Sequence, residues 1–403
     1  MATYKFLADY PDNKERDWTD SLQGVTHNND GYWIFTQKTR IFKFHISEDL
    51  EAASRVGNPN TEPMPQPLAQ LGCNHFGDPE YILLNGEGFL FVPVEGEDGG
   101  ACQDKPVIAV FRDSGGEGSL EFVDWALLPS QTADLGTGRA GWCAISPVNR
   151  LLYTSTNKVD SETPIFRYEI DFNRLLATGK LSLEPASDFV IRDKDDQPIE
   201  IKKYMQGGAF SPDGKLYTVS GRLRSEDDLV GDSWKAKYGG IRVFDQTGIL
   251  TEKSSTSGAG LKYAYKPGFT ARQEPEGITY WDTDQFAGER HVGIAGQLHG
   301  ILLNNQVGDD NIWLKHYSVA PIPNGASPPA FDIASSFCVN RNAQQTGEHE
   351  VHNLDASCPH LPKPENQRDL GSHPSCSEAV MAASELYKNV DGCAYCAPKC
   401  NIR

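Results

Sequence analysis

The segment at residues 205–224, "MQGGAFSPDGKLYTVSGRLR", decides the fold because it spells out one complete β-hairpin. A glycine pair leads into a short apolar strand, "SPDGK" places Pro, Asp and Gly where a tight turn needs them, and "LYTVS" follows as a second strand. Further on, "GGIRVFDQ" is typical of a third strand. The stretch therefore predicts an antiparallel unit of at least three strands.

The same phrase occurs four more times along the chain. The copies are "LQGVTHNNDGYWIFTQKTRIFKFHI", "HFGDPEYILLNGEGFLFVPVEG", "AGWCAISPVNRLLYTSTN" and "PEGITYWDTD", each followed by a strand rich in Phe, Ile or Val. Successive copies start about 55 to 70 residues apart, a spacing that suits a four-stranded blade with one long loop. The repeat predicts an all-β fold, a five-bladed β-propeller with blades at roughly 20–70, 71–135, 136–200, 201–270 and 271–320.

Two alternatives to this count stay open. Five hairpin-rich units could form a pair of β-sandwiches, and a further blade could lie in residues 48–70 or 171–200. The segment Thr3–Tyr10 alternates and is aromatic, so it could supply the outer strand that closes the last blade and removes an exposed edge.

Composition excludes several classes of partner. The chain has 403 residues, a net charge of −18 and no basic patch, which argues against a nucleic-acid or anionic-membrane partner. No apolar run approaches the roughly 20 residues that a membrane-spanning helix needs. We expect a monomer that acts on a carbohydrate or another small molecule.

The blade phrases quoted above resemble the five-bladed β-propeller superfamily. That superfamily contains glycan-cleaving enzymes, calcium-dependent nucleotidases and sugar-binding lectins. The resemblance covers about three quarters of the chain and matches no single family motif by motif. It implies the architecture, and leaves the chemistry to be argued from the site.

Polar residues stand just before the first strand of four predicted blades. They are Gln23, Asp78, Gln206 and Glu276, each beside a glycine that lets backbones crowd an axis. In a propeller the first strands line the central channel, so we expect these side chains to face it. Two carboxylates and two amides form an oxygen ring suited to Ca²⁺, and the alternative is a ring that holds ordered water.

Candidates for acid–base chemistry lie near the same blade entries. They are His27, His75, Arg139, Tyr204 with its neighbour Lys203, and Glu274 with its neighbour Arg272. Three tryptophans, at positions 33, 142 and 281, could pack between blades or stack on a sugar ring. The acidic run Glu95–Asp98 is typical of a solvated loop.

The strand phrases stop near Ser336, so we divide the chain into a propeller at 1–335 and a cysteine-rich extension at 336–403. The segment "PSCSEAVMAASELYKNV" predicts one amphipathic helix in the extension. The extension also holds six of the nine cysteines: Cys338, Cys358, Cys376, Cys393, Cys396 and Cys400.

Such cysteine density predicts three disulfides and an oxidising compartment. We therefore expect a secreted or periplasmic protein whose signal peptide is absent from this chain. In the alternative, Cys393, Cys396, Cys400 and a histidine hold zinc, which would leave the other three cysteines without partners. Cys73 and Cys102 could form a further bridge, and Cys143 is expected to be a buried thiol.

These observations favour a secreted propeller enzyme that cleaves an extracellular carbohydrate by hydrolysis or β-elimination, with or without calcium. His27 or His75 would act as acid or base, and Arg139 would neutralise a substrate carboxylate or a developing charge. A non-catalytic lectin is the first alternative. It should show five nearly identical sites, whereas the entry residues here differ from blade to blade. A calcium-bearing hydrolase of a small ester, lactone or phosphate is the second.

Overall fold

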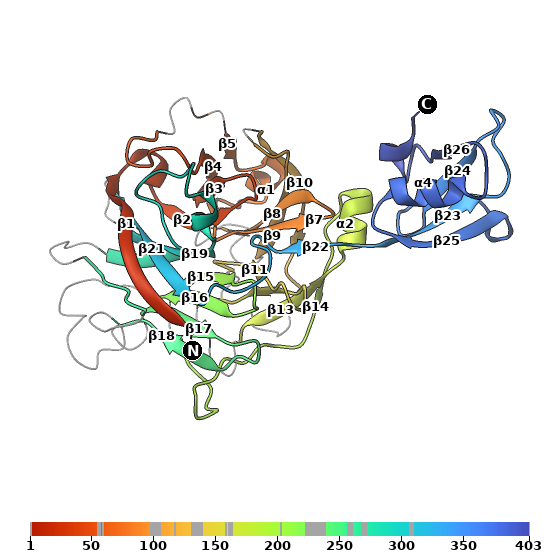
Figure 1. Ribbon diagram of the computed structural model, residues 1–403. Coiled ribbons are helices and arrows are strands. Elements are labelled where there is room, and N and C mark those ends of the chain that lie inside the picture. Colours follow the sequence, from red (N-terminus) through yellow and green to blue (C-terminus); the bar gives the residue numbers. More distant parts are fainter. Residues whose placement is uncertain are drawn as a thin grey trace. The chain divides into compact units, whose positions relative to one another are not determined.

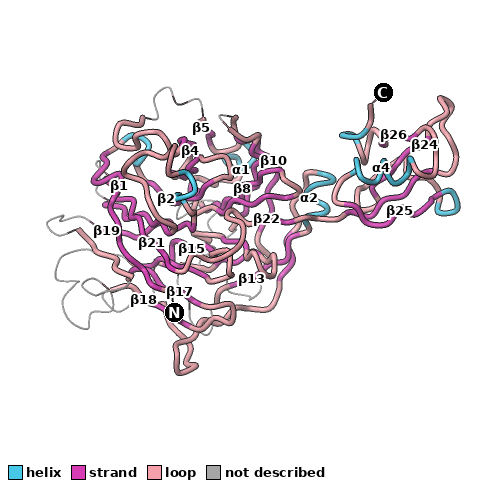
Figure 2. Tube along the Cα trace, in the orientation of Figure 1, coloured by secondary structure: helices cyan, strands magenta, loops and turns pink. Residues whose placement is uncertain are grey.

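The structure is a computed structural model, and the residues it describes fall into two compact units. The described residues are 2–54, 58, 60–96, 106–116, 118–129, 140–157, 159, 164–201, 204–221, 239–255, 261–266, 272–305 and 310–402. Unit 1 comprises 1–82, 88–169 and 183–329, and unit 2 comprises 83–87, 170–182 and 330–403. Figures 1 and 2 show that strands dominate unit 1 and that unit 2 combines strands with helices.

Within its described residues, unit 1 is built from five antiparallel sheets of consecutive strands. The first is β2 (Leu22–His27), β3 (Tyr32–Gln37), β4 (Arg40–His45) and β5 (Thr61–Pro63). The second is β7 (Glu80–Leu84), β8 (Glu87–Glu95), β9 (Val107–Asp113) and β10 (Leu120–Leu127), with β6 (His75–Phe76) added beside β8. The third is β11 (Ala144–Ile145), β12 (Leu152–Thr154), β13 (Phe166–Ile170) and β14 (Leu183–Pro185). The fourth is β15 (Met205–Phe210), β16 (Leu216–Ser220), β17 (Gly240–Phe244) and β18 (Leu250–Lys253). The fifth is β19 (Arg272–Tyr280), β20 (Leu298–Asn305), β21 (Asn311–Ala320) and β1 (Thr3–Glu15).

Each sheet touches the next in chain order, and the fifth returns to the first. The hydrogen bonds that mark the five junctions are Phe76 N to Lys38 O (2.9 Å), Asp78 N to Gly141 O (2.9 Å), Met205 N to Asn157 O (3.0 Å), Gln206 Nε2 to Pro275 O (3.3 Å) and His27 Nε2 to Tyr280 O (3.0 Å). A closed ring of sheets that begin with their innermost strand is the arrangement of a β-propeller.

The N-terminal strand closes the last sheet, as its alternating pattern predicted. β1 pairs antiparallel with β21, from Thr3 opposite Ala320 to Glu15 opposite Asn311. The fifth sheet thus takes its outer strand from the opposite end of the sequence. This pairing covers the edge that β21 would otherwise expose.

Residues 48–70 and 171–200 hold no additional sheet among their described residues. The first range contains β5 and the short helix α1 (Gln66–Gln70), and the second contains α2 (Phe172–Thr178) and β14. Both ranges therefore complete a sheet already predicted, because β5 and β14 are outermost strands.

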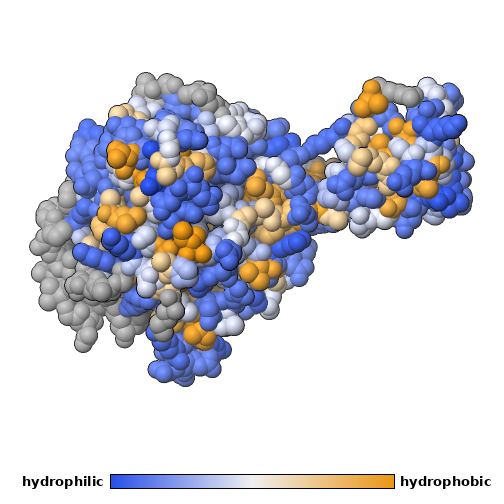
Figure 3. Space-filling model, viewed as in Figure 1, coloured by the Kyte–Doolittle hydropathy of each residue, from blue (hydrophilic) through white to orange (hydrophobic). Residues whose placement is uncertain are grey.

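Aromatic side chains fill the space between neighbouring sheets of unit 1. Trp33 on β3 meets Trp281 at 4.5 Å between ring centroids and an interplanar angle of 82°, and both rings are buried. Figure 3 shows a visible face that is mostly hydrophilic on each unit, with small separate hydrophobic patches. The described residues contain no helix long and apolar enough to span a bilayer.

Unit 2 contains a sheet that the sequence did not predict. Its order is β25 (Gln367–His373), β23 (Ser335–Asn340), β24 (His349–Asn353) and β26 (Val390–Gly392), and β22 (Ala330–Phe331) pairs with Leu83–Leu84. The expectation that strands end near Ser336 was wrong. Here β26 runs parallel to β24, and β25 pairs with β23 rather than with its neighbour in sequence, so the order differs from the repeated hairpin phrase of unit 1.

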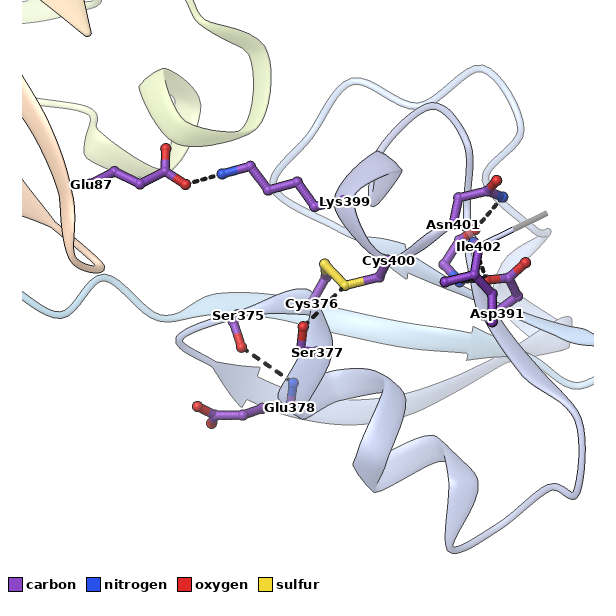
Figure 4. Close-up of a disulfide and its surroundings, with 11 residues drawn as sticks. Glu87, Ser375, Cys376, Ser377, Glu378, Asp391, Lys399, Cys400, Asn401 and Ile402 are labelled. Atoms are coloured by element: carbon purple, nitrogen blue, oxygen red, sulfur yellow. Dashed lines mark hydrogen bonds and ion pairs between the residues drawn. A yellow bond between two sulfur atoms is a disulfide. The ribbon is translucent and has the colours of Figure 1, made fainter. Parts of the chain in front are cut away.

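The predicted helix of the extension is confirmed as α4 (Cys376–Ser384). Ser375 begins it, because its hydroxyl oxygen accepts the backbone N–H of Glu378 at 3.2 Å (Figure 4). Ala379 and Ala383 on one face are buried against Phe337, Val339 and Val351 of the sheet. Short 3₁₀ turns lie elsewhere in the chain: η1 (Asp17–Thr19), η3 (Thr283–Phe286), η4 (Pro364–Asn366) and η5 (Pro398–Cys400).

The disulfide prediction for the extension is confirmed for one pair and wrong for four cysteines. Cys376 and Cys400 are bonded (Figure 4). The remaining four, Cys338, Cys358, Cys393 and Cys396, are free thiols.

Outside the extension, Cys73 is disulfide-bonded, and Cys102 lies outside the described residues. Cys143 is a buried free thiol, as expected.

We expect loss of the Cys376–Cys400 bond to destabilise unit 2 by about 2–4 kcal/mol, because the bond closes a loop of 24 residues. Hydrogen exchange followed by mass spectrometry should show faster exchange in 367–402 for Cys400→Ser. All seven tryptophans lie in unit 1, so tryptophan fluorescence reports on that unit separately. Unchanged exchange in 367–402 would contradict the prediction.

Candidate functional site

Asp78 occupies the point where the first strands of the sheets of unit 1 meet. Its Oδ1 accepts the backbone N–H of Val25 (2.9 Å), and its Oδ2 accepts those of Gly208 (3.1 Å) and Ile278 (3.2 Å). Its backbone forms a bridge with Trp142 of the third sheet. The buried carboxylate thus joins β2, β15 and β19, and the backbone of the same residue links them to the third sheet. Burial raises the pKa of this carboxyl, and the three N–H donors act in the opposite direction.

Glycines let the strands approach Asp78 this closely. A Cβ on Gly24 would lie 2.4 Å from the Asp78 Cα, and one on Gly277 would lie 2.7 Å from both Asp78 Oδ1 and the Gly24 Cα. A Cβ on Gly207 would lie 3.0 Å from Asp78 Oδ2. Only glycine fits such close approach. The residues that precede these glycines, Gln23, Gln206 and Glu276, therefore occupy equivalent positions around Asp78.

Five polar side chains gather around these positions, and we call them the polar ring. They are Gln23, His75, Glu95, Gln206 and Glu276. Four of them are partly exposed, whereas Glu276 is buried. They come from four different sheets, or from the segments that lead into them.

The first pair in the polar ring fixes the orientation of a histidine. His75 Nε2 lies 2.6 Å from Gln23 Oε1, and the amide nitrogen of Gln23 donates to the carbonyl oxygens of Ser21 (3.2 Å) and Leu22 (3.3 Å). An amide oxygen can only accept, so Nε2 of His75 is the donor. In the neutral ring Nδ1 is then the nitrogen without the proton.

The second pair brings carboxylates to the polar ring. Gln206 Nε2 donates to Oε2 of Glu276 at 2.5 Å, and Gly207 lies against the Glu276 carbonyl. Glu95 lies opposite His75 in the pairing of β6 with β8. The Cβ position on Gly141 is 3.8 Å from Glu95 Oε1 and 3.6 Å from the Met205 carbonyl oxygen, so Glu95 reaches toward the fourth sheet.

Sequence reasoning missed Glu95, because its acidic run was taken for a solvated loop. In the structure Glu95 is instead the last residue of β8. The repeat pattern could have indicated this, since the apolar residues of the second strand in that copy continue past Pro93 to Val94.

The structure does not bring His27 to the polar ring. His27 ends β2, four residues beyond Gln23, which is about 13 Å along an extended strand. It is buried, and its ring stacks on Trp281 at 4.7 Å between centroids; its Nδ1 lies 3.1 Å from Asn28 O, and its Nε2 lies 3.0 Å from Tyr280 O. Ser327 Oγ lies 3.2 Å from the same nitrogen.

Two further predicted site residues, Tyr204 and Glu274, have other positions. Tyr204 precedes β15 with φ 59°, and its backbone N–H donates to Asn157 Oδ1 at 2.6 Å. Glu274 is buried on β19, opposite Leu303 of β20. Arg139 lies outside the described residues.

The three tryptophans considered for sugar stacking are buried. Trp33 and Trp142 are 0% exposed, and Trp281 is 2% exposed. Trp142 Nε1 also donates to Ser155 Oγ at 2.8 Å. Of the two alternatives, packing between sheets is therefore the role these side chains have.

The predicted calcium ligands do not fit a calcium ion in this arrangement. Both oxygens of Asp78 accept backbone N–H groups, Oε2 of Glu276 accepts from Gln206, and Oε1 of Gln23 accepts from His75. Calcium needs six to eight oxygen ligands directed at one point. Here each of these oxygens is directed at a hydrogen-bond donor, so we derive no step through calcium.

We expect His27 to make the protein sensitive to acid. Burial lowers its pKa to about 4, although its carbonyl contacts raise the pKa, whereas an unfolded histidine titrates near 6.5. Between these values the unfolded chain binds more protons, so this contribution to stability is complete above pH 6.5 and is lost as the pH falls to about 4. Urea unfolding of the wild type and of His27→Gln at several pH values should show the wild type losing more stability over this window. Parallel curves would contradict the prediction.

Comparisons with known proteins add likenesses of fold only. No family model matches the chain, and no curated protein matches its sequence. An arabinanase from Bacillus subtilis is similar, with a TM-score of 0.39 and 11% identity over 78% of this chain and 97% of that one. The α-L-arabinanase of Cellvibrio cellulosa complexed with arabinohexaose has a TM-score of 0.36 and 12% identity, over 86% of this chain and 96% of that one. The PQQ-bound aldose sugar dehydrogenase of Streptomyces coelicolor has a TM-score of 0.35 and 11% identity, over 79% of this chain and 99% of that one. Likenesses at this level do not assign an activity.

Proposed function

We propose that the protein is a five-bladed propeller enzyme that hydrolyses a carbohydrate at the polar ring. The observation that carries this proposal is the joining of two carboxylates and an oriented histidine around the junction of the first strands. Glu95 and Glu276 come from different sheets: Glu276 accepts from Gln206, Glu95 lies opposite His75, and Nε2 of His75 donates to Gln23. Glycoside hydrolysis uses two carboxyl groups, one as acid and the other as base or nucleophile.

The two carboxyl groups differ in their surroundings, which suits different roles. Glu276 is buried, and its Oε2 accepts a hydrogen bond from the Gln206 amide. Glu95 is partly exposed, which suits exchange of a proton with substrate or water. His75 would assist as a base. Elimination in place of hydrolysis would need only the base, and is the nearest alternative chemistry.

The test is a screen of oligosaccharides with the full chain. Neutral arabino- and xylo-oligosaccharides and acidic uronic-acid oligomers would be incubated with the protein, with added calcium or with a chelator. New reducing ends without unsaturated products indicate hydrolysis, and unsaturated ends indicate elimination. Calorimetry on the same sugars separates binding from cleavage. Binding at several equivalent sites without cleavage would contradict the proposed enzyme function and support the lectin alternative.

A further inference from the structure

Four metal-binding side chains meet in unit 2. His352 lies on β24, Cys358 lies in the loop that follows, Cys393 comes directly after β26, and Cys396 lies in the next turn. One ligand atom from each lies within 4.8 Å of all the others. His352, Cys393 and Cys396 are buried, and Cys358 is partly buried.

The distances between these atoms are those of a tetrahedral site. Cys358 Sγ is 3.8 Å from Cys393 Sγ and 3.7 Å from His352 Nδ1, and Cys396 Sγ is 3.5 Å from the same Nδ1. With Zn–S near 2.3 Å and Zn–N near 2.0–2.1 Å, tetrahedral angles place sulfurs about 3.8 Å apart and sulfur and nitrogen about 3.6 Å apart. A disulfide would need sulfurs about 2.05 Å apart.

The surroundings of the four side chains match those of a metal centre. Backbone N–H groups of His360 and Asn353 donate to the sulfurs of Cys358 and Cys396. Nε2 of His352 is buried and makes no hydrogen bond among the described residues. The Glu350 carboxylate stands 3.6 Å from this nitrogen, where a carboxylate supports a metal-bound histidine in many proteins.

We propose that His352, Cys358, Cys393 and Cys396 bind one zinc ion. Three thiolates and one imidazole are ligands that zinc prefers, and four protein ligands leave no position for water or substrate. The ion therefore has a structural role. It ties the turn after β26 to β24 and to the loop that follows β24, beside the Cys376–Cys400 bond.

A structural ion suits the small core of unit 2. The buried residues around α4 are Phe337, Val339, Val351, Ala379 and Ala383, and a second cluster consists of Ala356, Cys393 and Cys396. Two of the ligands are themselves the core of the second cluster. Small units with few buried apolar side chains commonly need a metal or a disulfide to stay folded, and this unit would have both.

The first test is the metal content of the full chain, purified without chelator. We expect about one zinc per chain by plasma mass spectrometry in the wild type, and at least a tenfold loss in Cys396→Ser and in His352→Asn. Cys338→Ser and Cys143→Ser are matched controls, because each removes a buried thiol outside the four ligands. Both controls should retain the zinc. Zinc content that the ligand variants leave unchanged would overturn the proposal.

The second test does not depend on the folding of a variant. After zinc removal and addition of Co²⁺, the wild type should show the intense visible bands of a tetrahedral cobalt–thiolate site. Alkylation of the unfolded, chelated wild type without reductant should label Cys358, Cys393 and Cys396. If these cysteines resist labelling until a reductant is added, they form disulfides and the site does not exist. Octahedral, weakly absorbing cobalt would likewise overturn it.

Discussion

Asp78→Ala should lower the free energy of unfolding of unit 1 by roughly 3–9 kcal/mol, and Asp78→Asn by roughly 1–6 kcal/mol. Alanine leaves three buried N–H groups without an acceptor, those of Val25, Gly208 and Ile278. Asparagine keeps one oxygen, so its amide nitrogen faces either one or two of these donors. The graded loss follows from the number of donors left unsatisfied, at about 1–3 kcal/mol each.

Urea unfolding monitored by tryptophan fluorescence would measure both Asp78 variants, since the tryptophans report on unit 1. Asp188→Asn is the control, because Asp188 is exposed and its substitution should change stability by less than about 0.5 kcal/mol. Equal stability of Asp78→Asn and the wild type would mean that the carboxylate is not the centre of the ring of sheets.

Once a cleaved oligosaccharide is found, Glu276→Gln and His75→Ala should each lower kcat/KM by about 10²–10⁴-fold. Glutamine preserves the size of Glu276 and can still contact Gln206, but it cannot take a proton or carry charge. Alanine removes the ring nitrogen that Gln23 orients as the basic one. The measurement is initial rate against substrate concentration.

Two controls show whether such losses belong to the polar ring. Glu184→Gln changes an exposed carboxylate of the third sheet and should leave the rate unchanged. Near-ultraviolet circular dichroism of each variant should match that of the wild type. If both polar-ring variants keep full activity, the chemistry lies elsewhere and the proposed function fails, while the zinc proposal for unit 2 is unaffected.

Much of unit 1 was predictable because its hairpin phrase repeats. The turn "SPDGK" forms as expected, with Gly214 at φ +79° and its N–H bonded to Ser211 O at 2.8 Å. The pairing of β1 was also predictable. Residues 3–10 alternate like a strand but precede the first copy of the repeat, so the last blade is where this strand can be added.

Asp78 took a different position from its presumed equivalents for a physical reason. In the other copies the polar residue precedes the glycine, whereas Asp78 follows Gly77. That shift of one residue moves its side chain inward, because successive residues of a strand face opposite ways. His75 instead supplies the polar ring from that sheet.

The cysteines of unit 2 could not be assigned from their density. The number of cysteines favours disulfides, because three disulfides would use all six thiols of the extension. The number does not show which side chains lie close together. Cys393 and Cys396 are three residues apart in a tight turn, where Ala397 N bonds to Cys393 O at 2.9 Å, and His352 arrives from a strand that was not predicted. The Cys-x-x-Cys spacing of Cys393 and Cys396 was the available signal. The zinc alternative combined this pair with Cys400, which is bonded to Cys376, whereas Cys358 is the cysteine that lies beside the pair.

The pairing of β1 with β21 has a consequence for how the protein is made. Thr3 and Ala320 are hydrogen-bonded across 317 positions of sequence. A ribosome adding roughly 5–20 residues each second leaves the first strand waiting about 15–60 seconds for its partner. During that interval a half-apolar strand has no edge to join, which is the condition under which nascent chains associate with chaperones or with one another. The fifth sheet therefore cannot be completed until β21 has been synthesised, and a chain that stops before β21 cannot close the ring of sheets.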